Sequence, residues 1–127
     1  MDLLQVSIAL VRNSSNQYLL SKRVKGKIHS GQWEFPGGKI EVGESPGMAI
    51  DRELKEELGI KVASKSYRVQ YFYPYPNLYV HLFVWNIDSY IGLATSMEGQ
   101  EVAWFDSQVI NSVDYLAGDQ KILHSIN

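Results

Sequence analysis

Runs of branched apolar residues and alternation of apolar with polar residues give most of this chain the pattern of β-strands. The clearest run is Leu3–Val11, which predicts a buried strand. Turn-forming residues at 12–16 precede a returning strand, and two prolines within Tyr73–Asn77 exclude a central strand, so we expect a second turn there. The predicted strands are residues 3–11, 17–22, 61–73, 78–87 and 101–105, with 65–73 and 78–87 paired as a hairpin.

A helical period replaces this alternation after residue 45. Ser45 suits an N-cap, Pro46 suits the first helical position, and Gly59 suits the left-handed position that ends a helix. We expect a loop over 88–99, a helical turn over 106–110 and a second helix over 117–126. The residues that the first helix should bury form an apolar stripe: Gly47, Ile50, Leu54 and Leu58.

Charged residues gather on the adjoining flank of the first predicted helix. Four of them share an arc roughly 140° wide: Arg52, Glu53, Glu56 and Glu57. Glu53 and Glu57 are like charges four residues apart, which destabilise an isolated helix by about 0.2–0.5 kcal/mol, and Glu44 adds a further acid nearby. Mg²⁺ or Mn²⁺ would compensate this repulsion; the alternative is a solvated acidic face. The preceding Gly37-Gly38 pair favours a site, because glycine lets the backbone approach a ligand closely.

Composition limits the possible functions. The net charge is −2, so the chain lacks the basic footprint of a nucleic-acid-binding protein, and a small anionic substrate would need local positive charge or a metal. Absence of cysteine excludes disulfides, thiolate zinc sites and cysteine nucleophiles, and it fits a reducing cytosol. No run approaches 18 apolar residues, so we expect no membrane span. The length predicts one domain over residues 1–127, and we expect it to be cytoplasmic.

The stretch from Gly38 to Ile60 resembles the Nudix box at every defining position. It has Gly38, five residues, Glu44, seven residues and then RELKEELGI, so many residues are fixed at set spacings over 23 positions. Similarity to the MutT branch extends to Leu4-Gln5-Val6, Val11-Arg12-Asn13, Trp33-Glu34-Phe35-Pro36, Glu98-Gly99-Gln100 and Trp104. The resemblance implies an α/β Nudix fold, an α/β/α sandwich with a mixed β-sheet. The periodicity alone predicts only a mixed α and β domain.

The resemblance also implies roles for individual residues. Glu53 would be the general base or a metal ligand, Arg52 would orient the carboxylates, and Glu44 would be a further catalytic acid; family members differ over which glutamate is the base. The implied metal ligands are the Gly37 carbonyl, Glu53, Glu56, Glu57 and Glu98, holding Mg²⁺ or Mn²⁺.

Four residues are candidates for binding the substrate: Arg23, Phe35, Tyr75 and Asp119. Arg23 is the member of a basic run that MutT-like proteins direct at the substrate; the alternative is a solvated loop. Phe35 would line the nucleotide pocket or belong to the core, and Tyr75 would supply an aromatic wall. Asp119 stands where MutT proteins carry an asparagine, and its alternative role is that of an acid at a helix N-terminus. Aspartate only accepts hydrogen bonds, which suits a base edge that presents donors.

The implied reaction is nucleoside triphosphate plus water giving nucleoside monophosphate and pyrophosphate, with attack at the β-phosphorus. Oxidised guanine nucleotides such as 8-oxo-dGTP are the first expectation for the substrate, and CTP or 5-methyl-dCTP is the alternative. A third hypothesis, from another class, is a regulatory Nudix domain that binds nucleotides without catalysis, although the intact set of acids argues against it. We expect a monomer or homodimer with no nucleic-acid or membrane partner.

Overall fold

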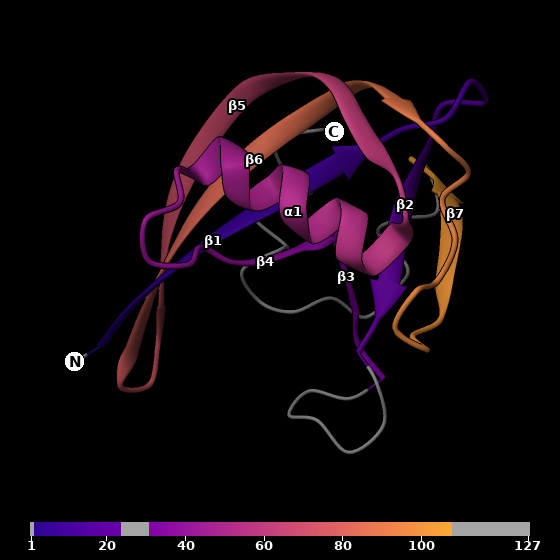
Figure 1. Ribbon diagram of the computed structural model, residues 1–127. Coiled ribbons are helices and arrows are strands. Elements are labelled where there is room, and N and C mark those ends of the chain that lie inside the picture. Colours follow the sequence, from indigo (N-terminus) through magenta and orange to yellow (C-terminus); the bar gives the residue numbers. More distant parts are fainter. Residues whose placement is uncertain (1, 24–30, 108–127) are drawn as a thin grey trace.

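A computed structural model describes residues 2–23 and 31–107 of the chain. Within these residues the chain forms one helix and seven strands, and the helix lies against one face of the strands (Figure 1). The elements are β1 (Asp2–Val11), β2 (Gln17–Lys22), β3 (Trp33–Glu34), β4 (Gly37–Lys39), α1 (Pro46–Leu58), β5 (Lys61–Tyr75), β6 (Leu78–Ile91) and β7 (Val102–Asp106).

The strands form two sheets. The larger has the order β4-β1-β6-β5, in which β1 pairs parallel with β6 and the other pairings are antiparallel. The smaller is antiparallel, with the order β3-β2-β7. Figure 1 shows α1 lying across the larger sheet, with β4 running beneath it. The predicted α/β class and mixed sheet are confirmed, whereas the second predicted helix, 117–126, lies outside the described residues.

Helix α1 begins and ends where its capping residues predict. The Ser45 hydroxyl accepts a hydrogen bond from Met48 N (3.1 Å), which satisfies one of the free N–H groups of the first turn. Gly59 adopts φ 68°, and its N–H donates to the Lys55 carbonyl. The buried stripe Ile50, Leu54 and Leu58 packs against the sheet, as its spacing predicts.

Strand β1 is apolar at four successive positions, Ile8–Val11. Ala9 and Val11 pack toward α1, whereas Ile8 and Leu10 belong to a second apolar cluster with Phe35 on the opposite face of the sheet. Where a strand is covered on both faces, neither face favours polar residues, so the alternation of apolar with polar residues disappears over Ile8–Val11. β1 therefore forms the centre of the core and fixes the position of both neighbours, β4 and β6.

Two predicted boundaries are wrong. The turn expected at Tyr73–Asn77 is shorter, because β5 continues through Tyr75 and Pro74 still pairs with Tyr79. β5 is an edge strand in the described sheet, with a neighbouring strand on one side only. An edge strand tolerates proline, because the missing N–H can face the side that has no partner strand. The tight turn falls at 76–77, with Asn77 at φ 62°. β6 extends to Ile91, so the loop expected from residue 88 begins at residue 92 instead.

The described part of the chain contains no helix that is both long and apolar enough to span a bilayer.

Candidate active site

A pocket of about 420 Å³ opens where β2, β4, α1 and the loop before β7 meet. It contains carboxylates from three separate parts of the chain together with two cationic residues. The pocket is lined by Ser21, Lys22, Arg23, Glu34, Gly37, Glu53, Glu57, Glu98 and Gln100. A second pocket of about 520 Å³, around Arg12, Tyr18 and Asp88, contains none of the predicted site residues.

The glycine pair permits the close approach of α1 to the sheet. Gly37 has φ 147°, and a Cβ atom there would collide with the backbone of Ser7 and Ile8 on β1. A Cβ atom on Gly38 would lie only 2.5 Å from the Glu53 carboxyl carbon. Position 37 therefore requires glycine for space, whereas a side chain at position 38 would displace the Glu53 carboxylate, because β4 lies between β1 and the acidic flank of the helix.

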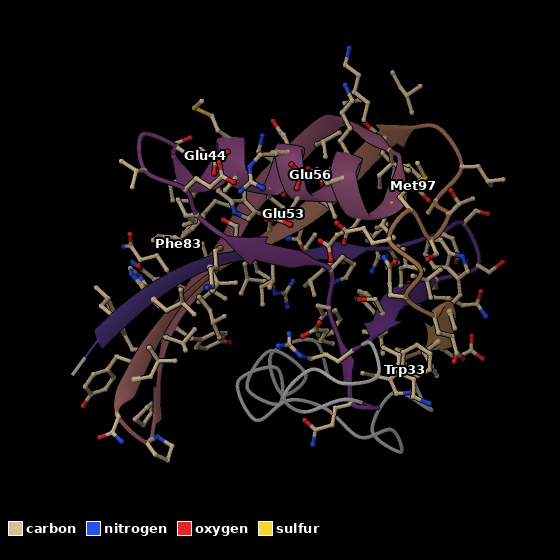
Figure 2. The ribbon with its side chains drawn as sticks, turned by 60° about the horizontal axis from the view of Figure 1, so that its bottom comes forward. Trp33, Glu44, Glu53, Glu56, Phe83 and Met97 are labelled. Atoms are coloured by element: carbon tan, nitrogen blue, oxygen red, sulfur yellow. The ribbon has the colours of Figure 1, made fainter. Side chains whose placement is uncertain are left out.

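Arg52 binds several groups around the acidic flank, which Figure 2 shows following one side of α1. Its Nε and Nη2 donate to the two carboxylate oxygens of Glu44 at 2.7 and 2.9 Å. Its Nη1 donates to Glu53 (2.8 Å) and Glu56 (3.2 Å), and Nη2 also donates to the Lys39 carbonyl (2.9 Å). The hydrogen bond from Arg52 lowers the pKa of Glu44, and the bond to Glu44 raises the pKa of Arg52 further. This arrangement supports an orienting role for Arg52 and places Glu44 behind it as its anchor.

Burial raises the pKa values of both Glu53 and Glu57, but different hydrogen-bond donors oppose the two shifts. Burial raises the pKa of Glu53, against the opposing hydrogen bond from Arg52. Burial, with the nearby charge of Glu53 as the next cause, raises the pKa of Glu57 to about 9, although Gly37 N–H donates to its carboxylate at 3.0 Å. Burial in this pocket therefore disfavours the ionised form of Glu57. Such perturbed groups in a cleft are typical of functional sites.

The chemistry of the pocket fits a hard divalent cation, but its side chains do not form a finished coordination set. Carboxylates and a backbone carbonyl are the ligands that Mg²⁺ and Mn²⁺ prefer. The positive charge of a bound cation would also favour the ionised form of Glu57. Across residues 2–23 and 31–107, no three potential ligand side chains are grouped closely enough to hold a metal ion. Glu53 is turned to Arg52 and Glu57 to Gly37 N–H, so binding requires these two side chains to reorient.

The structure brings most, but not all, of the predicted residues together. Arg23 and Glu98 line the pocket with Glu53, Glu57 and Gly37. Four predicted residues lie away from the pocket or outside the described residues. The side chain of Glu56 is 51% exposed and is bound to Arg52. Phe35 is 2% exposed within the core cluster, so its contact with a base remains a prediction. Tyr75 pairs through its backbone with Leu78 beside the hairpin turn, and Asp119 lies outside the described residues.

Four pocket residues were not predicted: Ser21, Lys22, Glu34 and Gln100. Glu34 forms an ion pair with Arg23 (3.4 Å), because β2 and β3 pair in antiparallel register. Its position just before the glycine pair was the available signal. Gln100 is buried at 9% exposure, and its place in Glu98-Gly99-Gln100, which resembles the MutT branch, was the available signal.

The fold and this pocket define a class of protein: a mixed α/β domain that places a carboxylate-rich helix against a glycine-containing strand. Comparison with known proteins agrees. A model of the NUDIX domain matches residues 2–125, and this chain belongs to that family.

Named relatives extend the comparison. An 8-oxo-dGTP diphosphatase of Haemophilus influenzae is 30% identical over 98% of this chain and 91% of its own length. A CTP pyrophosphohydrolase of Escherichia coli is 32% identical over 82% of this chain and 76% of its own length. A structure of MutT, described for Aliivibrio salmonicida and Vibrio cholerae, superimposes with a TM-score of 0.86 at 25% identity, covering 98% of this chain and 96% of the other.

Proposed function

We propose that this protein is a metal-dependent nucleoside triphosphate pyrophosphohydrolase that removes oxidised guanine nucleotides such as 8-oxo-dGTP from the nucleotide pool. It would convert a nucleoside triphosphate and water into a nucleoside monophosphate and pyrophosphate. The observation that carries the proposal is the convergence of Glu53, Glu57 and Glu98 on one pocket beside Gly37. Nudix hydrolases generally depend on divalent metals, and Mg²⁺ or Mn²⁺ suits this oxygen-rich set.

The pocket residues can divide the chemistry between them. A bound divalent cation lowers the pKa of a coordinated water and neutralises phosphate charge. Within the protein, Glu53 is suited to accept a proton, because burial raises its pKa while Arg52 holds its carboxylate in place at 2.8 Å. Arg23 and Lys22 also line the pocket, and their positive charge suits a polyphosphate. Glu57 and Glu98, with the Gly37 carbonyl, would hold the metal.

The choice of nucleotide rests on the relatives. The 8-oxo-dGTP diphosphatase of H. influenzae aligns over nearly the whole chain, which favours oxidised guanine as the substrate. The CTP pyrophosphohydrolase of E. coli has slightly higher identity over a shorter span, so CTP or a modified dCTP is the second candidate. Asp119 suits both, because an acceptor-only side chain can bind the cytosine amino group or N7–H of 8-oxoguanine.

A panel of nucleotides tests the proposal. The panel contains 8-oxo-dGTP, dGTP, CTP, 5-methyl-dCTP and the remaining standard triphosphates, each assayed for pyrophosphate release with Mg²⁺ and with EDTA. We expect the highest kcat/KM with 8-oxo-dGTP and no turnover in EDTA. Turnover of no nucleotide, together with nucleotide binding, would favour the regulatory alternative. Full activity in EDTA would exclude the metal-dependent mechanism.

A further inference from the structure

The loop that carries Glu98 is exposed but firmly attached. Residues 92–100 lie at the surface between β6 and β7, and Gln100 is the single buried residue among them, at 9% exposure. Buried polar side chains cost free energy unless they are hydrogen-bonded. The buried side chain of Gln100 is therefore expected to form hydrogen bonds within the protein.

The hydrogen bonds of Gln100 join the loop to the end of α1. Its Nε2 donates to the Glu57 carbonyl at 3.0 Å. Its Oε1 accepts from the backbone N–H of Glu98 (3.0 Å) and from the Ser96 hydroxyl (2.8 Å). One side chain therefore contacts the backbone of both glutamates that line the pocket from this side, Glu57 and Glu98.

The loop backbone adds two more bonds to the same helix end. Met97 N donates to the Glu57 carbonyl and Thr95 N to the Leu58 carbonyl, each at 3.0 Å. Figure 2 shows Met97 at this end of α1. The last carbonyls of a helix have no partner within the helix, so these donors satisfy them. Gly99, at φ 78°, reverses the chain so that the Gln100 side chain turns back beneath Glu98.

From these contacts we infer that Gln100 is a positioning residue, which fixes the place of Glu98 in the pocket relative to Glu57. Glu98 comes from a loop and Glu57 from a helix, 41 residues apart in sequence (98 minus 57). Without Gln100, Glu98 would keep its charge but lose the acceptor of its own backbone N–H, which leaves Met97 N as the nearest remaining link to the Glu57 carbonyl. Residues that orient metal ligands through hydrogen bonds commonly change metal affinity by 10–100-fold when they are replaced. The inference rests on the proposed function insofar as Glu98 is taken as a metal ligand.

A purely structural role for Gln100, capping α1, is the competing explanation. Both roles allow a loss of stability on substitution, so stability cannot separate them. The two roles predict different coupling between the effects of replacing Gln100 and Glu98 on metal affinity. If Gln100 acts on the metal through Glu98, removal of the Glu98 charge should abolish the effect of replacing Gln100 on metal affinity. If Gln100 only caps the helix, the two effects should be independent and multiply.

The test is a double-mutant cycle in the full chain, read out as Mn²⁺ affinity by electron paramagnetic resonance. The variants are Gln100→Leu, Glu98→Gln and the double variant, and Gln70→Leu, an exposed glutamine on β5, is the control. We expect Gln100→Leu to weaken Mn²⁺ binding about tenfold. The double variant should bind no more weakly than Glu98→Gln alone, and the control should match the unmodified protein.

A second variant, Gln100→Glu, keeps the inference testable if Gln100→Leu fails to fold. It keeps the length and the acceptor oxygen of glutamine but, when ionised, loses the donor to the Glu57 carbonyl. We expect it to weaken Mn²⁺ binding as well. Unchanged Mn²⁺ affinity in both Gln100 variants, or multiplicative effects in the cycle, would overturn the inference. Because Mn²⁺ binding needs no substrate, this outcome is distinct from failure of the proposed function, which would appear as absent nucleotide turnover in the unmodified protein.

Discussion

Replacement of Gly38 by alanine would test whether the position of the Glu53 carboxylate controls turnover. A Cβ atom at residue 38 would lie 2.5 Å from Glu53 Cδ and Oε1, where ordinary contacts begin at 3.4 Å. The carboxylate must therefore move by roughly 1 Å, and a displacement of this size can cost about 10²-fold in rate. The clashing atoms end a flexible side chain, so the backbone has no need to shift. We expect kcat/KM to fall about 100-fold, while the free energy of unfolding changes by less than about 1 kcal/mol.

Gly37→Ala is the matched control for this prediction. Its Cβ atom would meet the backbone of Ser7 and Ile8, which belong to the buried central strand, and its φ of 147° disfavours any residue but glycine. We expect a loss of about 3 kcal/mol or more in the free energy of unfolding. Pyrophosphate release with Mg²⁺ and urea unfolding are measured on both variants. Gly38→Ala with normal kcat/KM, or as unstable as Gly37→Ala, would refute the reasoning.

Three further predictions concern individual acids. Glu53→Gln should lower kcat by roughly 10²–10⁴ with the fold retained, as judged by circular dichroism; a fall below tenfold would assign the base to another glutamate. Glu57 has a folded-state pKa of about 9 against 4.5 as its ordinary value, so the folded state holds an extra proton between these values. The free energy of unfolding of the metal-free protein should therefore fall as pH rises through this range, by up to about 1.4 kcal/mol per pH unit, and urea titrations of Glu57→Gln should show a flatter profile. Asp119→Ala should lower kcat/KM for the preferred nucleotide by about 1–3 kcal/mol of transition-state binding and reduce discrimination between nucleotides; an unchanged ranking would leave Asp119 as a helix-terminal acid.

Local rules predicted the helix better than the hairpin. The bounds of α1 follow from Ser45, Pro46 and Gly59, whose effects act within a few residues of each. The length of β5 depends instead on its place at the edge of the sheet, since an edge strand tolerates Pro74 and a central strand does not. Sequence order does not reveal which strand becomes the edge, and the turn was consequently predicted too long.

For the acidic residues of the site, too, local sequence rules predicted one part of the arrangement and the tertiary structure decided the rest. A helical wheel places Glu53, Glu56 and Glu57 on one flank, and the structure keeps all three on α1. It then separates them, because Glu57 faces Gly37 inside the pocket while the Glu56 side chain is half exposed. A wheel gives angles about the helix axis but contains no information on where β4 lies.

The sequence by itself determined the family, the capped helix and the acidic flank, because each depends on residue types at fixed short spacings. Only the tertiary structure decided which carboxylates are desolvated and which partners hold them. Burial of Glu57 requires β1 and β4 to pack beside α1, and the contact of Gln100 with Glu57 joins residues from separate elements. Desolvation and long-range hydrogen bonds depend on distances through space, and those distances arise only when apolar burial on both faces of β1 brings the elements together.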